Sequence, residues 1–185
     1  MQVKNTPEKF GVVTKGFHWL TALLVVTLLC VGLYMVRAEK NASLIQLYGL
    51  HKSFGVTVLT LTFFRMLWHV YTRKPAIVTG LPKWEQWAAH TGHFFLYICL
   101  FGMPLSGWLM SSAFGRTVSF FGLFSLPDLI GQDQARGAQL AALHEYLAYA
   151  LIGMIAIHVG AALRHHFFIK DATLKRMLPF GNPQS

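Results

Sequence analysis

The stretch HEYLAYALIGMIAIHVGAALRHH, from His144 to His166, decides how the rest of the chain is interpreted. It is long, apolar and free of proline, which is typical of a membrane-spanning helix. His144 and His158 lie fourteen residues apart in it, and fourteen steps of roughly 100° return to nearly the same helix face. At about 1.5 Å per residue the two side chains stand ~21 Å apart along the axis. One helix therefore offers imidazole nitrogen at two depths, one towards each membrane surface.

Composition predicts an integral membrane protein. The chain has 185 residues, of which 54% are hydrophobic, and its mean hydropathy is +0.46. We expect an all-α, four-helix membrane bundle forming a single domain over residues 1–185, with helices at about 12–37, 44–71, 82–112 and 139–168. The first apolar stretch, Phe17 to Val36, is longer than the apolar region of a cleavable signal. The net charge of +9 indicates basic loops, not nucleic-acid binding.

Local signals add detail at the helix ends and loops. Thr6-Pro7-Glu8 is typical of a helix start, and Ser43-x-x-Gln46 matches a capping box. The aromatic, Gly-rich connection from Ala113 to Gln139 is predicted to be an interfacial cover over one mouth of the bundle. Cys30 and Cys99 fall inside predicted spans, so we expect no disulfide. No C-x-x-C-H motif for covalent c-type haem is present.

Basic residues predict the orientation in the membrane. One side carries eleven of them: Lys4, Lys9, Lys15, Arg65, Arg73, Lys74, Lys83, Arg164, Lys170, Lys175 and Arg176. The other side carries five: Arg37, Lys40, Lys52, Arg116 and Arg136. Because positive loops stay in the cytoplasm, both termini are expected there.

Four of the nine histidines match in depth. His51 and His144 lie near the outer ends of their helices and form a predicted outer pair. His18 and His158 lie nearer the inner ends and form a predicted inner pair. Two histidines on one haem iron leave no open position, which suits electron transfer. A zinc or copper site is disfavoured because its ligands would converge at one depth, although a single intramembrane histidine can also simply hydrogen-bond across helices.

A small residue follows each of these four histidines by one turn. These residues are Ala22, Gly55, Ala148 and Ala162. At the same position after the other five stand Arg73, Phe94, Tyr97, Ile169 and Lys170. A haem lying beside a helix needs space about one turn from its ligand, so the pattern favours the first four as ligands.

Several motifs resemble those of the bacterial cytochrome b561 family. They are FHWL around His18, LHKSFG around His51, AAHTGH, HEYLAYALIGMIAIH, and ALRHHF followed by KDATLKRMLP. The resemblance covers nearly the whole chain. It implies a multi-pass protein of the bacterial inner membrane with two haem b groups, ligated by His18, His51, His144 and His158. It also implies an oxidoreductase that carries electrons between a periplasmic-side donor, such as superoxide, and ubiquinone.

Other polar residues are assigned roles on this basis. Arg65 lies fourteen residues after His51, at the depth of the inner haem, and is predicted to bind a propionate; the alternative is a snorkelling arginine. Lys52 is predicted as a cofactor-binding residue. With Arg37, Lys40, Arg116 and Arg136 it would form a positive funnel for an anionic donor, unless these are scattered solvated charges. His90, His93, His165 and His166 are candidates for quinone contact near the inner surface.

Two other classes of function stay open. The chain could be a non-enzymatic anchor and electron conduit for a soluble redox protein, as hydrogenase cytochrome b relatives imply. The third hypothesis is a haem-free transporter that uses intramembrane histidines. The absence of a Soret band from the purified protein would support it. The expected partners are the lipid bilayer, quinone, and a small anionic donor such as superoxide or a redox protein, with no nucleic acid.

Overall fold

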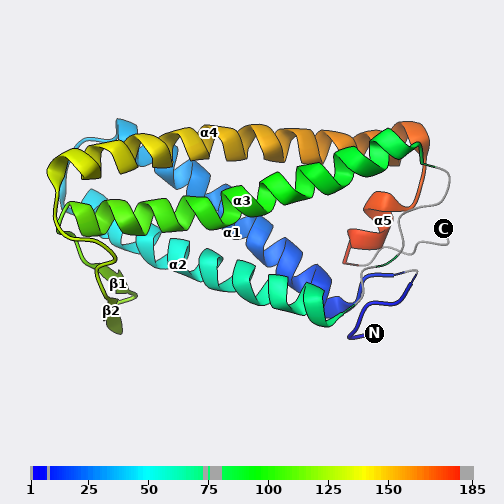
Figure 1. Cartoon of the computed structure of the whole chain (residues 1–185), viewed down its shortest axis with the longest axis horizontal. Coiled ribbons are helices and arrows are strands. Elements are labelled where there is room, and N and C mark those ends of the chain that lie inside the picture. The colour runs from blue at the N-terminus through cyan, green and yellow to red at the C-terminus, as the bar shows by residue number, and fades with distance from the viewer. Residues whose placement is uncertain (1, 8, 73–74, 76–80, 180–185) are drawn as a thin grey trace.

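Four long helices form the protein, each long and apolar enough to cross a membrane. The computed structural model describes residues 2–7, 9–72, 75 and 81–179 (Figure 1). The long helices in this part of the chain are α1 (Val12–Arg37), α2 (Ala42–Tyr71), α3 (Lys83–Ala113) and α4 (Gln134–Arg164). A π-helical turn, η1 (His165–Ile169), continues α4, and the short helix α5 (Thr173–Met177) follows. The expected all-α membrane bundle is thus confirmed.

The bundle buries small hydroxyls and exposes large apolar side chains. Thr62 and Ser112 are almost completely buried, whereas Leu23 and Ile157 each expose 66% of their surface. In water this distribution would be unfavourable, but in lipid the apolar side chains face a matching solvent and small residues let the helices approach closely. The exposed apolar surface therefore indicates a lipid environment, as do the length and composition of the helices.

The packed core lies halfway along the bundle. Val25 of α1, Val58 of α2, Cys99 of α3 and Leu151 of α4 form one buried cluster. Backbone contacts are closest between α3 and α4, between α1 and α2, and between α2 and α3. Over the described residues, α4 is not closely packed against α1 or α2. Side chains, or a bound group, can therefore lie between α4 and these two helices.

Two predicted helix starts are wrong. Thr6-Pro7 does not begin α1: the Thr6 hydroxyl accepts from the Lys9 amide (3.0 Å) in an isolated turn, and Gly11 is the N-cap. Glu8 lies outside the described residues, as do Arg73, Lys74 and residues 76–80. In α2 the cap is Asn41, which accepts from the Leu44 amide (2.8 Å), so the Ser43 capping box is not used. Short polar side chains make the same local hydrogen bond to the backbone in isolated turns and in helix N-caps. The sequence pattern alone therefore does not tell a turn from a helix start.

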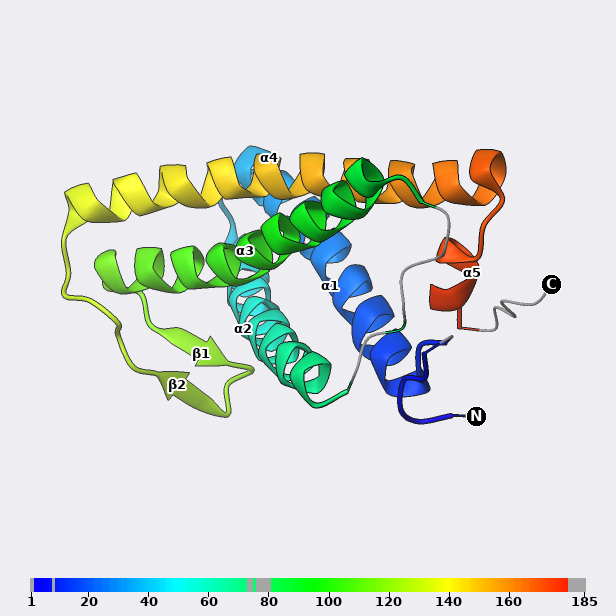
Figure 2. The same cartoon turned by 45° about the vertical axis from the view of Figure 1, so that its right-hand side comes forward.

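The third connection folds into a hairpin that the sequence did not predict. Strands β1 (Val118–Phe120) and β2 (Phe124–Leu126) pair antiparallel around a turn in which Phe121 and Gly122 have positive φ. The Ser53 hydroxyl donates to the Ser119 carbonyl (2.9 Å) and accepts from the Phe121 amide (3.1 Å), which fastens the hairpin to α2. Figure 2 shows the hairpin projecting beside the bundle. Beyond it, Asp133 caps α4, which begins five residues before the predicted residue 139.

The opposite end of the bundle carries both terminal segments. Trp19 of α1 donates from Nε1 to the Met177 carbonyl (2.9 Å), and Lys15 donates from Nζ to the Leu178 carbonyl (2.8 Å). Asn5 accepts from the Gly11 amide (2.9 Å) and the Thr14 hydroxyl (2.8 Å). The segment from residue 2 and helix α5 therefore close the same end, away from the hairpin (Figure 1).

Candidate functional site

The four predicted histidines meet as two pairs. The ring centroids of His18 on α1 and His158 on α4 are 6.3 Å apart. Those of His51 on α2 and His144 on α4 are 6.5 Å apart. The first pair, the inner pair, lies towards the terminal segments, and the second, the outer pair, lies towards the hairpin. Both join α4 to a helix against which its backbone is not closely packed.

Each ring separation suits one metal ion held between two imidazoles. A metal-to-imidazole bond is about 2.0–2.1 Å, so two bonds occupy roughly 4 Å of a 6.3 or 6.5 Å separation. The remaining ~2 Å is about what two ring radii require. His93 also contacts His158, but its ring centroid is 5.3 Å away, too close for a metal ion between the two rings. The predicted pairs are the ones with the required spacing.

A fourteen-residue spacing recurs on all four helices. On α4 it joins His144 to His158, and on α2 it joins His51 to Arg65. On α1 it joins His18 to Gly32, and on α3 it joins His93 to Gly107. Gly32 and Gly107 contact the outer pair, while Arg65 and His93 contact the inner pair. Since fourteen residues return to nearly the same face, each helix presents one residue to each pair.

Of the two glycines at the outer pair, Gly107 makes room for an imidazole ring, whereas Gly32 stands at ordinary contact distance from one. A Cβ atom at Gly107 would lie 3.1 Å from Cε1 of His144, and one at Gly32 would lie 3.5 Å from Cε1 of His51. Gly55, one turn after His51, has no atom within 4 Å of a built Cβ. The predicted space beside His51 is therefore present. Sequence reasoning missed Gly32 and Gly107, although their spacing from His18 and His93 was a usable signal.

An apolar pocket adjoins the outer pair. His51, His144 and Gly55 line it together with apolar residues from all four helices. It has a volume of about 60 Å³ and is partly open. A group as large as haem would therefore extend through the open side. A larger cavity of about 330 Å³, lined by residues such as Tyr34 and Asn41, touches neither pair.

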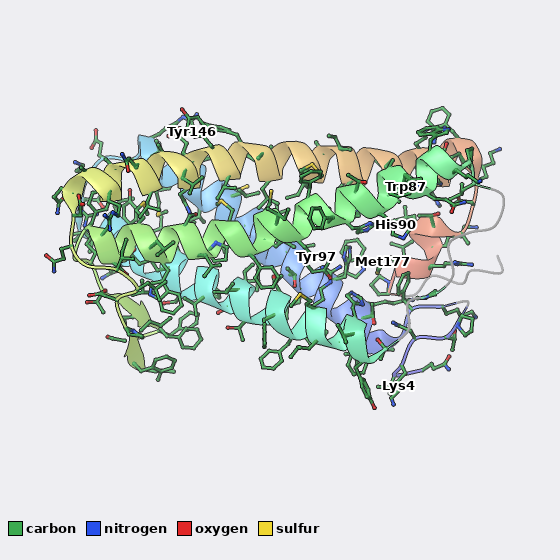
Figure 3. The ribbon with its side chains drawn as sticks, in the orientation of Figure 1. Lys4, Trp87, His90, Tyr97, Tyr146 and Met177 are labelled. Atoms are coloured by element: carbon green, nitrogen blue, oxygen red, sulfur yellow. The ribbon has the colours of Figure 1, made fainter. Side chains whose placement is uncertain are left out.

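Arg65 lies at the inner pair, as its spacing predicted. Its guanidinium donates to Nδ1 of His18 at 3.3 Å and lies 5.6 Å from the centroid of the Tyr97 ring. Figure 3 shows Tyr97 on α3, in the middle part of the bundle. The Arg65 Nε atom is buried without a hydrogen bond, and no described carboxylate forms an ion pair with this arginine. The site therefore holds a cation without a described anionic partner.

The predicted basic funnel is only partly assembled. Lys52 approaches the Thr117 carbonyl (3.5 Å) and lies close enough to Arg116 for their charges to interact. Arg136 instead forms an ion pair with Asp133 (3.9 Å), and Arg37 donates to the Leu33 carbonyl of its own helix (3.1 Å). The outer basic residues brought together are thus Lys52 and Arg116.

The four histidines considered for quinone contact have different surroundings. His90 donates to the Gln86 carbonyl (2.7 Å) at the start of α3, near Trp87 (Figure 3). His93 bonds the Ala89 carbonyl (2.6 Å) and contacts the inner pair, while His166 stacks edge-on against Phe167. His165 bonds Asp171 (2.6 Å) and lies 3.8 Å from Glu85. Only His165 among these four is bracketed by two carboxylates within the described chain.

Comparison with known proteins identifies the family. A family model described as prokaryotic cytochrome b561 matches residues 9–180. The chain belongs to the prokaryotic cytochrome b561 family. It is therefore a multi-pass protein of the bacterial inner membrane and a b-type haem protein of electron transfer, as the resemblance implied.

Three relatives show how far the likeness extends. Cytochrome b561 homolog 2 of Escherichia coli is 37% identical over 179 residues, 96% of this chain and 95% of the relative. Cytochrome b561 homolog 1 of Escherichia coli is 32% identical over 163 residues, 88% and 92% of the two chains. The "Probable superoxide oxidase CybB" of Yersinia pestis is 28% identical over 172 residues, 93% and 97% of the two chains. The likeness covers at least 88% of this chain in each case.

The residues present fit b-type haem in this cytochrome b561. Two histidine pairs have a separation that admits an iron atom, and the outer pair faces an apolar pocket. The Nδ1 atom of His144 lies 2.9 Å from the Ser106 hydroxyl, which leaves the other ring nitrogen of this histidine for ligation.

Gly107→Ala should weaken haem binding at the outer pair. The new Cβ would press on Cε1 of His144, and overpacking of this kind costs about 1–3 kcal/mol. Two measurements check this: the haem content of the purified protein, and the transfer of its haem to added apomyoglobin. Gly102→Ala is the matched control, because its Cβ would meet the flexible Leu147 side chain at an ordinary 3.5 Å. Equal haem retention in the two variants would contradict this role of Gly107.

Proposed function

We propose that this cytochrome b561 holds two b-type haems and carries electrons across the inner membrane, between a periplasmic-side donor and ubiquinone. His18 and His158 would hold the inner haem. His51 and His144 would hold the outer one. The observation that carries the proposal is the presence of two imidazole pairs, each with the separation that one iron requires, at two depths.

Bound b-type haem supplies a one-electron centre, and two histidine ligands leave it no open position for a substrate. The protein's residues fix where the two centres lie. The fourteen residues between His144 and His158 separate the levels by ~21 Å, and the buried cluster around Leu151 fills the layer between them. With both termini in the cytoplasm, as the basic residues predict, the outer pair faces the periplasm.

The contact between Arg65 and His18 supports a role for Arg65 towards a haem propionate. Arginine only donates hydrogen bonds, so Nδ1 of His18 must accept, and a neutral ring then carries its proton on Nε2. Iron ligation through Nε2 requires that proton to be on Nδ1. Arg65 would therefore turn away from His18 when His18 binds iron, and the buried guanidinium would need an anion. A propionate is such an anion.

Titratable groups at the inner end support quinone reduction there. Ubiquinone takes up two electrons and two protons to form the quinol. His165 is held between Asp171 and Glu85, so it can pass a proton while its charge stays balanced. Burial alone would raise the pKa of Asp171, but hydrogen bonds from Thr173 and His165 hold it below its usual value. Asp171 therefore stays ionised beside His165, which supports quinone contact at this histidine.

The outer end suits a small anionic donor. Lys52 follows His51 directly, and Arg116 lies near Lys52, so two positive charges adjoin the outer pair. One relative is named as a probable superoxide oxidase. We therefore propose superoxide as the donor: two superoxide ions give up two electrons and leave as two O₂ molecules. The chain would then be an oxidoreductase of the superoxide:ubiquinone type.

Pyridine haemochrome analysis of the purified protein should give two haems b per chain. His51→Ala and His144→Ala should each remove one redox component, and His18→Ala and His158→Ala the other, because each change breaks one pair. Redox titration followed by optical spectra assigns the components. If His51→Ala and His158→Ala removed the same component and spared the other, the pairing would be wrong.

Arg65→Leu should loosen the inner haem or shift its potential, since the buried cation facing the propionate is lost. The outer component should stay nearly unchanged. Arg65→Lys should be intermediate because it keeps the charge without the bidentate fork. Arg164→Leu is a matched control, since that arginine is half exposed and bonds Glu85 (3.1 Å). Full haem content with both midpoints unchanged in Arg65→Leu would show that the arginine serves another purpose.

Reduction by superoxide should slow as salt rises. Added salt shortens the distance over which charges attract the anion, and this screening length is ~8 Å at physiological ionic strength. Lys52→Gln or Arg116→Gln should slow it at low salt and spare reduction by a neutral dye, whereas Arg136→Gln, at an arginine already paired with Asp133, should change little. Stopped-flow spectroscopy measures these rates. A salt-independent rate would reject steering by these charges. Electron transfer only in the presence of a co-purified protein would favour the conduit alternative.

A further inference from the structure

We infer that Ser106 is a positioning residue for the haem ligand His144. Ser106 lies on α3, is 97% buried, and has its hydroxyl 2.9 Å from Nδ1 of His144. It stands beside Gly107, whose missing side chain admits the same imidazole ring. One turn of α3 thus supplies both the space for the ring and a polar contact to it.

The hydrogen-bond directions follow from the available protons. The Ser106 hydroxyl has one hydrogen, and it donates this to the Met103 carbonyl at 2.8 Å. Towards His144 the Ser106 oxygen must therefore accept, so His144 carries its proton on Nδ1. This contact selects the ring form in which Nε2 of His144 is unprotonated and can ligate iron.

The other ligands lack this arrangement. Nδ1 of His51 is buried without a hydrogen bond, and Nδ1 of His18 faces a guanidinium that can only donate. Among the described residues, His144 is the one proposed ligand whose Nδ1 meets a neutral acceptor. Ser106 therefore acts on one haem and not on the other.

The consequence is an effect on the outer haem's potential. A hydrogen bond accepted from Nδ1–H orients a ligating histidine and raises the basicity of its other nitrogen. A more basic ligand favours the oxidised iron, so Ser106 lowers the midpoint potential of the outer haem relative to the same site without it. This inference rests on the proposed haem sites and adds the direction in which Ser106 shifts the midpoint potential of the outer haem.

Redox titration of the full-length, haem-loaded protein tests it. In Ser106→Ala, the redox component that His144→Ala removes should shift to a more positive midpoint potential. Loss of such a contact should also weaken retention of that haem about 10- to 100-fold. Ser106→Thr keeps the hydroxyl and should restore the wild-type midpoint. Ser111→Ala is the matched control: the same change on the same helix at a residue that is also buried. It should leave both midpoints unchanged.

The outcomes separate this inference from the proposed function. A positive shift, or selective loss of the outer haem, in Ser106→Ala with rescue by threonine supports the role of Ser106. Unchanged midpoints, a shift in the other component, or loss of both haems overturns it. If His144→Ala itself removes no haem, the proposed haem sites fail, whatever Ser106 does.

Discussion

Polar side chains in a lipid-embedded helix must find partners inside the bundle, and here this requirement determines which faces of the helices meet. Each helix carries one residue at each of two levels, fourteen residues apart, and α4 supplies a histidine at both. Midway between the levels, seven residues from each, stand Val25, Val58, Leu100 and Leu151, which pack together or line the adjoining pocket. The bundle is thus two polar layers separated by one apolar layer.

The two polar layers have different chemistry. The outer layer offers glycines and a serine hydroxyl, which leave space and accept a hydrogen bond. The inner layer offers a buried guanidinium and a third imidazole, His93, in contact with His158. A cation near a haem stabilises its reduced form, whereas an acceptor on the ligand favours the oxidised form. With haems at the proposed sites, both effects would place the higher potential at the inner haem, in the direction of the proposed electron flow from the periplasm to quinone.

Much of this arrangement could be predicted from the sequence, because membrane spans and helix faces follow from apolar length and periodicity. The four spans, the two histidine pairs and the depth of Arg65 all depend on spacing within one helix. Contacts between helices were harder to predict. Ser106 and Gly107 acquire their roles only when α3 packs against α4, and His93 reaches the inner pair for the same reason. The hairpin was missed because its strands are three residues each, too short for a periodic signal.

The most direct test of the two-layer account is the location of iron. Anomalous scattering at the iron edge, from crystals of the haem-loaded protein, locates each iron atom without a model of the haem. The account predicts two peaks, one between the rings of His18 and His158 and one between those of His51 and His144, ~20 Å apart along the bundle. A single peak, or an iron ligated by His93 in place of His18, would contradict it.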